Sequence, residues 1–398
     1  MRRKRLLLLG LLLGSGLFMD QILLHCALGS GYLRGSRIAP FDPPIFYPGQ
    51  QVSLREIAAH DREQSPGDTP FLFDSELGWA PTPGHPIGEM KFDWAGARCS
   101  VSPLERERHA DLTRIICVGC SFTLGDEVED EQAWPYLLDA ASARHEFANL
   151  GMGAYGLDQA LLRYRRDGRP LRGDEVWLGW MPAASLRLVT MYRPAQRHWA
   201  RMVRFKPRFR ITRAGDLRLI PNPVESIAHM HAVLSSQKKF LEALDGNDAW
   251  VARSPLAYAP EGSHWLHLTG LGRMALTLHE RRDREVADWL LDEQSEVFRL
   301  LLAIVDAFRE ETASDGARLR LLVLPDRGAL EDLAQEGRGY WETVTDAWER
   351  AGIEVIDCSA ALVASGAAEE GRHWAPGGHY SVEGNRIVAE VLETLLDL

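Results

Sequence analysis

The chain has 398 residues, of which 45% are apolar and 25% are charged, an ordinary composition for a globular protein with a large core. A formal net charge of −11 at pH 7 argues against general binding to nucleic acids. Five cysteines, at positions 26, 99, 117, 120 and 358, make no disulfide framework.

The N-terminus has the pattern of an export signal. Cations occupy residues 2–5 and precede an apolar stretch over residues 6–19, which resumes after Gln21 and runs to Leu28. No small-x-small cleavage site follows, so an uncleaved signal-anchor over residues 1–28 is favoured over a cleaved signal peptide. We therefore expect the membrane as a partner of this segment. The body would lie outside the cytoplasm on the periplasmic side, anchored in the inner membrane; a secreted protein is the alternative.

Residues 29–112 follow no regular helical or strand period. The first part, residues 29–70, is rich in Gly, Pro and polar residues, which favour turns over regular elements. Short apolar pieces between Gly/Pro turns then occupy residues 71–112. This composition predicts a linker followed by a small β-rich lead-in.

From residue 113 onward, short apolar runs alternate with helical patterns, which is typical of a parallel sheet. Strands are expected at 115–118, 146–150, 175–180, 318–324 and 354–356. Helices are expected at 132–144, 157–166, 285–311, 331–351 and 382–396. The alternation breaks at about 191–280, which indicates an insertion in a domain over residues 113–398. We predict an α/β fold: a flavodoxin-like three-layer α/β/α sandwich with a five-stranded parallel sheet, plus a helical insertion and the N-terminal membrane segment.

Two side chains with nucleophile and base chemistry fall on the same edge of this predicted sheet. Ser121 follows the first strand in a Gly/Ser turn, and His379 precedes the last helix. Carboxyl ends of parallel strands form the usual site in open α/β sheets, and helix-terminal N–H groups there stabilise anions. A serine hydroxyl needs a base to take its proton, and histidine has a suitable pKa. Taken alone, each residue is more often structural, as a turn serine or a helix-capping histidine.

Four segments, in order, resemble a known family. They are Gly119-Cys-Ser-Phe-Thr-Leu-Gly125, the lead-in Asp74-Ser-Glu-Leu-Gly-Trp79, the segment Asn149-Leu-Gly-Met-Gly-Ala-Tyr-Gly-Leu-Asp-Gln159 and the segment His379-Tyr-Ser-Val-Glu-Gly-Asn385. The chain resembles the SGNH (GDSL-type) serine hydrolases, in particular bacterial, exported or membrane-anchored members with an N-terminal extension. The resemblance brackets residues 74–398 without the insertion.

This resemblance implies a reaction through an acyl-enzyme. Ser121 would attack an ester carbonyl, and His379 would act as its base. The oxyanion would be bound by the backbone N–H of Ser121 and by that of Gly153 or Ala154, where Ala154 stands at the family's usual glycine. No metal or organic cofactor is required.

The sequence departs from the family pattern at three places. Cys120 stands where the family has an aspartate before the nucleophile, and Pro376 stands where an aspartate orients the histidine. The third block lacks its asparagine, and Ser185 is the nearest polar replacement and a candidate substrate contact. Substitutes for the orienting carboxylate are Asp357, Glu369 and Glu370.

Two further patterns have a functional and a structural interpretation. The pair Cys117 and Cys120 suggests redox or metal chemistry, but no second Cys or His pair lies at ligand spacing, so a buried apolar role is favoured for Cys117. The insertion carries eight cations without an intervening acid between Arg193 and Arg213. Arg197, Arg201, Arg204 and Arg208 share one face of an expected helix. Arg193 and Arg197 are candidate contacts to an anionic glycan, a phosphate-bearing lipid or a membrane surface; a solvated face is the alternative.

The expected function is a serine-dependent ester hydrolase that acts on an O-acylated envelope carbohydrate. One alternative is an acyltransferase on a cell-surface polymer, which shares the nucleophile. The other is a catalytically inactive SGNH scaffold that binds glycan, which the missing asparagine and aspartate favour. The acyl group, the acceptor and the oligomeric state stay open.

Overall fold

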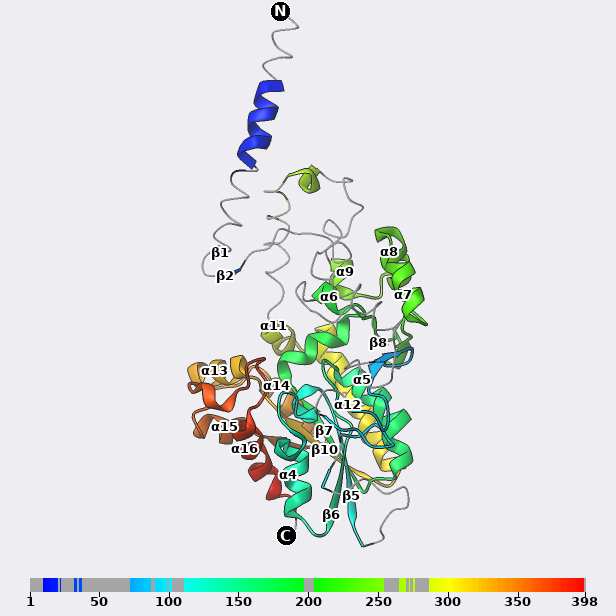
Figure 1. Ribbon diagram of the computed structural model, residues 1–398, viewed down its shortest axis with the longest axis vertical. Helices are drawn as coiled ribbons and strands as arrows, with labels where there is room; N and C mark the ends of the chain where they lie inside the picture. The colour runs from blue at the N-terminus through cyan, green and yellow to red at the C-terminus, as the bar shows by residue number, and fades with distance from the viewer. Residues whose placement is uncertain are drawn as a thin grey trace, which may run out of the picture.

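The computed structural model describes residues 10–20, 22, 32–33, 36–37, 72–86, 90–98, 100–101, 111–196, 204–253, 265–269, 272, 275 and 286–396. In this part of the chain, one parallel sheet lies between two layers of helices, and smaller elements lie beyond one end of the sheet (Figure 1).

The sheet has five parallel strands: β5 (Thr113–Val118), β6 (His145–Asn149), β7 (Glu175–Trp180), β10 (Arg318–Val323) and β11 (Glu354–Asp357). Their spatial order is β11-β10-β7-β5-β6. This is the flavodoxin-like order 2-1-3-4-5, whose switch point lies between the first and third strands. The predicted fold class and each of the five expected strands are therefore confirmed, with ends that differ by one or two residues.

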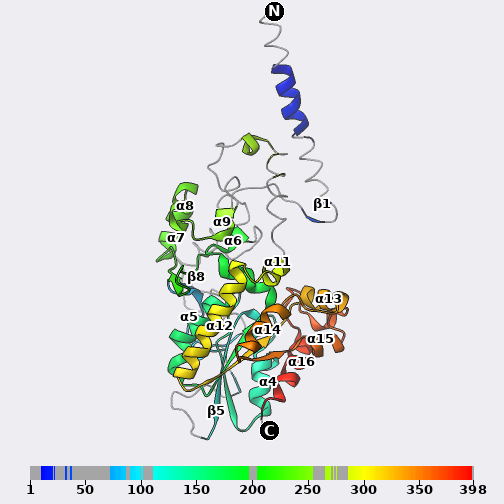
Figure 2. The same ribbon diagram turned by 180° about the vertical axis from the view of Figure 1, so that it is seen from behind.

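Apolar side chains on both faces of the strands explain why both faces are covered. On β5, Ile116 and Val118 contribute to one buried cluster, whereas Ile115 and Cys117 contribute to the other. The first cluster includes side chains of α5 (Leu157–Arg163), α12 (Glu296–Ser314) and α14 (Glu342–Arg350). The second includes side chains of α4 (Trp134–Ala141), α13 (Arg327–Glu336), α15 (Ser359–Ala364) and α16 (Val382–Glu393). Figures 1 and 2 show α4 beside α16 on one side of the sheet and α5 beside α12 on the other.

Several predicted helices have different bounds. The single helix expected at 331–351 is two helices, α13 and α14, because Gly337 ends α13 in the left-handed conformation at φ 69°. Glycine is the usual residue at this position of a helix end. The helix expected at 285–311 is also two, α11 (Val286–Leu291) and α12, which Ser295 caps at its N-terminus. In both cases the apolar residues keep helical spacing across the point where one helix ends and the next begins, so the sequence pattern did not show the break.

The lead-in and the insertion both contain β-structure. β3 (Leu72–Asp74) and β4 (Gly78–Ala80) form an antiparallel hairpin, as the β-rich prediction for this stretch implies. The insertion contains a second hairpin, of β8 (Arg208–Ile211) and β9 (Leu217–Ile220). Its helices are α6 (Arg193–Gln196), α7 (Ile227–Leu234), α8 (Gln237–Leu244) and α9 (Ala249–Arg253). The insertion is therefore mixed rather than purely helical.

The cations of the insertion differ most from expectation. Arg208 lies on strand β8, not on a helical face with its neighbours. Four of the eight cations are buried: Arg193, Arg204, Lys206 and Arg208. Neither a solvated face nor an exposed binding patch describes these four residues.

Residues 10–20 form a helix at the end of the molecule far from the sheet (Figure 2). Within the described residues, no helix combines the length and apolar character that a membrane span needs. Residues 1–9 and 23–28 of the predicted anchor lie outside the described part of the chain, so the signal-anchor stays a prediction. The short strands β1 (Tyr32–Leu33) and β2 (Ser36–Arg37) pair with each other.

Candidate active site

Ser121 begins the short helix α3 (Ser121–Leu124), directly after β5 and next to β7 in the sheet. It therefore lies at the switch point, where open α/β sheets place their sites. The turn depends on Gly119, because a Cβ atom there would lie 2.6 Å from the carbonyl oxygen of Gly179 on β7. Ser121 is 4% exposed, and its hydroxyl makes no hydrogen bond to another described residue.

His379 makes a close contact with a carboxylate that the sequence did not identify. Its Nδ1 lies 2.6 Å from Oε2 of Glu127, a residue in the loop after α3. The same carboxylate accepts hydrogen bonds from the backbone N–H of Gly377 at 2.6 Å and of His379 at 3.2 Å. Partial burial raises the pKa of Glu127, but the hydrogen bonds from His379 and Gly377 outweigh it, so the pKa lies below its ordinary value. Glu127 thus orients the imidazole as an ionised acceptor.

Two of the three carboxylates that the sequence offered as possible partners of His379 are engaged elsewhere. Asp357 accepts hydrogen bonds from the indole N–H of Trp341 and the backbone N–H of Ser359. Glu370 pairs with Arg372 at 2.6 Å. In the described structure none of Asp357, Glu369 and Glu370 contacts His379, and Glu127 occupies the place on Nδ1 for which they were possible substitutes. Glu127 stands next in space to His379 although 252 positions separate them in the chain.

The other ring nitrogen of His379 makes no hydrogen bond to a described residue. Nε2 lies 3.9 Å from Oδ2 of Asp126, outside hydrogen-bond range, and donates to no described residue. The ring packs against Phe122, the neighbour of Ser121, with centroids 5.4 Å apart. Nε2 and the Ser121 hydroxyl are not hydrogen-bonded to each other, but the contact of the ring with Phe122 places His379 beside the residue that follows Ser121.

A buried arginine of the lead-in holds the loop that carries Glu127. The guanidinium of Arg98 pairs with Asp130 at 2.8 Å and donates to the carbonyl oxygens of Leu124, Gly125 and Val128. Its donors therefore fix the loop on both sides of Glu127. This role could not be read from the sequence, because nothing local distinguishes Arg98 from a surface arginine.

Asn385 connects the histidine segment to the serine segment. Its side chain accepts from the backbone N–H of Trp134 at 3.1 Å and donates to the carbonyl oxygen of Tyr380 at 3.1 Å. The indole N–H of Trp134 in turn donates to the carbonyl oxygen of Phe122 at 3.0 Å. The asparagine in the fourth family-like segment thus has a structural role, because it fixes the start of α16 against α4.

The oxyanion turn, residues 151–156, lies against α3. The N–H of Met152 donates to the carbonyl oxygen of Gly119 at 3.1 Å, and a Cβ atom at Gly151 would lie 2.8 Å from the backbone of Thr123. In the described structure, the backbone N–H groups of Ser121, Gly153 and Ala154 donate to no protein acceptor. Ser121 and the turn after Asn149 are thus brought together with unused donors, as an oxyanion site requires.

Ala154 has a backbone φ of +63°, a conformation that costs a non-glycine residue about 1–2 kcal/mol. We expect Ala154→Gly to leave the free energy of unfolding unchanged or to raise it by up to about 1 kcal/mol, because relief of strain exceeds the added entropy of the unfolded chain. The exposed helical residue Ala334 is the control, since Ala334→Gly should lower stability by about 1 kcal/mol. Urea unfolding measures both, and destabilisation of equal size at the two positions would contradict this prediction.

The sequence offered three residues as candidate substrate contacts, and each has different surroundings in the structure. Ser185 is 2% exposed, and its Oγ accepts from the indole N–H of Trp180 at 3.0 Å, so it faces the interior. Arg193 is 8% exposed in α6 and donates to Gln196 at 3.4 Å. Arg197 lies outside the described residues. None of the three is brought to the serine and histidine by a contact in the described structure.

Three of the five cysteines lie in the described part of the chain, and none of these three pairs in a disulfide. Cys117, Cys120 and Cys358 are free and buried, and burial raises the pKa of Cys117 and of Cys358 well above the ordinary thiol value. Within the part of the chain that the structure describes, no group of three or more His, Cys, Asp or Glu side chains is placed to hold a metal ion.

No protein-family profile matches the chain, and no curated protein matches it. Solved structures do. A lipolytic protein of the G-D-S-L family from Desulfitobacterium hafniense is 13% identical, with a TM-score of 0.33, over 71% of this chain and 99% of that one. A G-D-S-L lipolytic protein from Veillonella parvula is 12% identical, with a TM-score of 0.34, over 71% and 98%. The acetyl xylan esterase AlAXEase is 13% identical, with a TM-score of 0.36, over 71% and 99%.

Proposed function

We propose that this protein is a serine-dependent ester hydrolase of the SGNH type that works through an acyl-enzyme on Ser121. The observation that carries the proposal is the contact of 2.6 Å between His379 and Glu127 at the sheet edge that also holds Ser121. A carboxylate on Nδ1 fixes the tautomer in which Nε2 can accept a proton and stabilises the imidazolium that forms. The absent family aspartate is thus replaced by a residue from a different loop.

The reaction follows from these positions. The hydroxyl of Ser121 attacks the ester carbonyl while Nε2 of His379 takes its proton. The backbone N–H groups of Ser121 and the oxyanion turn stabilise the tetrahedral oxyanion. The C–O bond to the alcohol then breaks, and His379 returns the proton to the leaving oxygen. Water, activated by the same imidazole, attacks the acyl-serine, and the acid leaves as Ser121 is regenerated.

The substrate class proposed is an O-acylated carbohydrate of the cell envelope. Its support is the export-type N-terminus, which would place the body outside the cytoplasm, anchored in the inner membrane. A polymer substrate also suits a site at an open sheet edge beside a long insertion. The acyltransferase alternative uses the same acyl-serine and differs only in the acceptor.

The test is labelling of the full chain, purified in detergent, with a fluorophosphonate probe, followed by hydrolysis of p-nitrophenyl acetate. We expect the wild type to be labelled and Ser121→Ala and His379→Ala to lose both labelling and turnover. The control is Ser142→Ala, because Ser142 also contacts a histidine, His145, at 2.7 Å, but at the amino end of β6.

Labelling that persists in Ser121→Ala would place the nucleophile elsewhere and refute the assignment. A folded wild type that neither labels nor hydrolyses would favour the inactive glycan-binding scaffold. With an active enzyme, acyl transfer to an added oligosaccharide in competition with water would identify the transferase.

A further inference from the structure

We propose that Trp79, on the lead-in hairpin, positions the backbone N–H of Ala154, which the family resemblance already implies as an oxyanion donor. The proposal rests on the proposed ester hydrolysis. It assigns a catalytic purpose to the β3–β4 hairpin, which lies outside the sheet.

One peptide plane determines the direction of this donor. The indole Nε1 of Trp79 donates to the carbonyl oxygen of Gly153 at 2.9 Å, and Trp79 is fully buried. In a planar trans peptide the C=O of residue 153 and the N–H of residue 154 point in opposite directions. Because Trp79 holds the Gly153 carbonyl toward the hairpin, the N–H of Ala154 in the same peptide points away from the hairpin. That N–H has no protein acceptor in the described structure.

The strained backbone shows that the orientation is imposed. Ala154 holds a φ of +63°, which an alanine does not adopt without compensation. The neighbouring side chain is anchored to the hairpin as well, because the hydroxyl of Tyr155 donates to the carbonyl oxygen of Trp79 at 2.5 Å. The Gln159 side chain donates to the carbonyl oxygen of Leu77 at 2.7 Å. Three hydrogen bonds thus join the hairpin to the oxyanion turn and to the start of α5.

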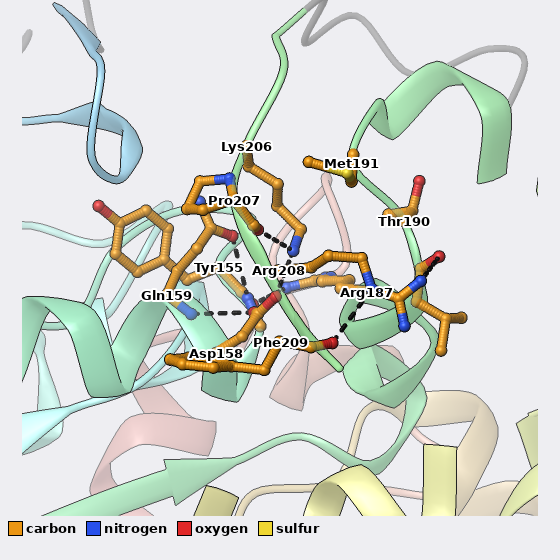
Figure 3. Close-up of polar contacts among 12 residues, drawn as sticks. Tyr155, Asp158, Gln159, Arg187, Thr190, Met191, Lys206, Pro207, Arg208 and Phe209 are labelled. Carbon is orange, nitrogen blue, oxygen red and sulfur yellow. Dashed lines mark hydrogen bonds and ion pairs between the residues drawn. The ribbon is translucent and has the colours of Figure 1, made fainter. Parts of the chain in front are cut away.

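The insertion and the segment just before it hold the same turn from another direction (Figure 3). Arg187 donates to the carbonyl oxygen of Tyr155 at 2.7 Å, so the next peptide of the turn is fixed as well. Lys206 forms a buried ion pair with Asp158 in the first turn of α5. The hairpin also meets the insertion, since a Cβ atom at Gly78 would lie 2.7 Å from the carbonyl oxygen of Phe205. The turn therefore lies between two supports that come from outside the sheet.

The test removes one hydrogen-bond donor and keeps an aromatic ring. Trp79→Phe should lower kcat for p-nitrophenyl acetate about 10–100-fold, a fraction of the loss seen when an oxyanion donor is deleted outright. KM should change less than about 3-fold, because the donor acts mainly on the transition state. The affinity for a boronic acid, which forms a tetrahedral adduct, should fall in parallel with kcat/KM.

The matched control is Trp341→Phe. Trp341 is also fully buried and also donates its indole N–H, to Asp357 at the end of β11, which is the opposite edge of the sheet from β6. Its kcat should stay within about 3-fold of the wild type. If Trp79→Phe does not fold, Tyr155→Phe loosens the hairpin through its bond to the Trp79 carbonyl and should lower kcat about 3–10-fold.

The outcomes separate the two proposals. A wild type that labels at Ser121, with equal kcat in Trp79→Phe and Trp341→Phe, would overturn the positioning role and leave the hydrolase intact. A loss in Trp79→Phe that lies entirely in KM would also overturn it. Absence of labelling in the folded wild type would overturn both proposals together.

Discussion

Glu127→Gln is expected to lower kcat by about 10²–10⁴-fold, although the amide has nearly the same size as the carboxylate. The amide oxygen of the variant could still accept a hydrogen bond from Nδ1 of His379, where the carboxylate lies 2.6 Å away. A neutral amide, however, no longer stabilises the imidazolium. It can also present its NH₂ group to Nδ1 and so fix the wrong tautomer. KM should change little, since Glu127 acts through His379 and not on the substrate.

The pH profile gives a second readout of the same change. The lowered pKa of Glu127 means that its carboxylate stays ionised to lower pH than an ordinary glutamate. Its contribution to stability is therefore present above the ordinary glutamate pKa and is lost as the pH falls through the lowered value. Glu127→Gln carries no such charge, so this carboxylate's contribution to the pH dependence of stability should be absent in the variant.

Two further variants make this prediction specific. A Cβ atom at Gly377 would lie 2.6 Å from the carboxylate oxygens of Glu127, at the far end of a flexible side chain. Gly377→Ala should therefore displace the carboxylate and reduce kcat without a large loss of stability. Glu370→Gln, which removes an exposed carboxylate nine residues before His379, should leave kcat within about 2-fold. Equal activity of Glu127→Gln and the wild type would refute the orienting role.

The sequence identified the strands and helices of the fold better than it identified Glu127, the residue that orients His379. Parallel strands have strong local signals, such as Ile115–Val118 and Glu175–Trp180, and Ser121 and His379 follow from strand ends and helix starts. Glu127 has no comparable signal, because its role depends on a left-handed residue at φ +67° and on a loop closure across 252 positions. Closeness to His379 in the sequence therefore could not reveal this carboxylate.

Four cations of the insertion, Arg193, Arg204, Lys206 and Arg208, are buried against expectation for a related physical reason. A run of arginines and lysines indicates charge, but not whether acidic partners from other segments will neutralise it. Lys206 forms an ion pair with Asp158, and Arg208 forms one with Glu296; both partners come from other segments of the chain. Burial of a charge is tolerated only when such a partner is present. The spacing of the run therefore could not reveal that these residues hold the fold together.

Lys206→Met is expected to lower the free energy of unfolding by about 3–5 kcal/mol, because it leaves Asp158 charged and unpaired inside the protein. The side chains of Lys206 and Asp158 are 1% and 0% exposed, and Lys206 also donates to the carbonyl oxygen of Pro207 at 3.1 Å. Burial lowers the pKa of Lys206, although Asp158 opposes this effect. The charge of the lysine is thus maintained chiefly by its partner. Urea unfolding followed by tryptophan fluorescence measures the loss.

The double variant Lys206→Met with Asp158→Asn should recover most of this loss, since replacement of a whole buried pair by neutral groups is often close to neutral. The exposed pair of Lys238 and Glu242, with side chains 84% and 63% exposed, provides the control. Lys238→Met should change the free energy of unfolding by less than about 1 kcal/mol. If Lys206→Met and Lys238→Met were equally mild, the insertion would not be locked to α5 by this pair. The oxyanion turn would then be held without this pair, by contacts such as those of Trp79 and Arg187.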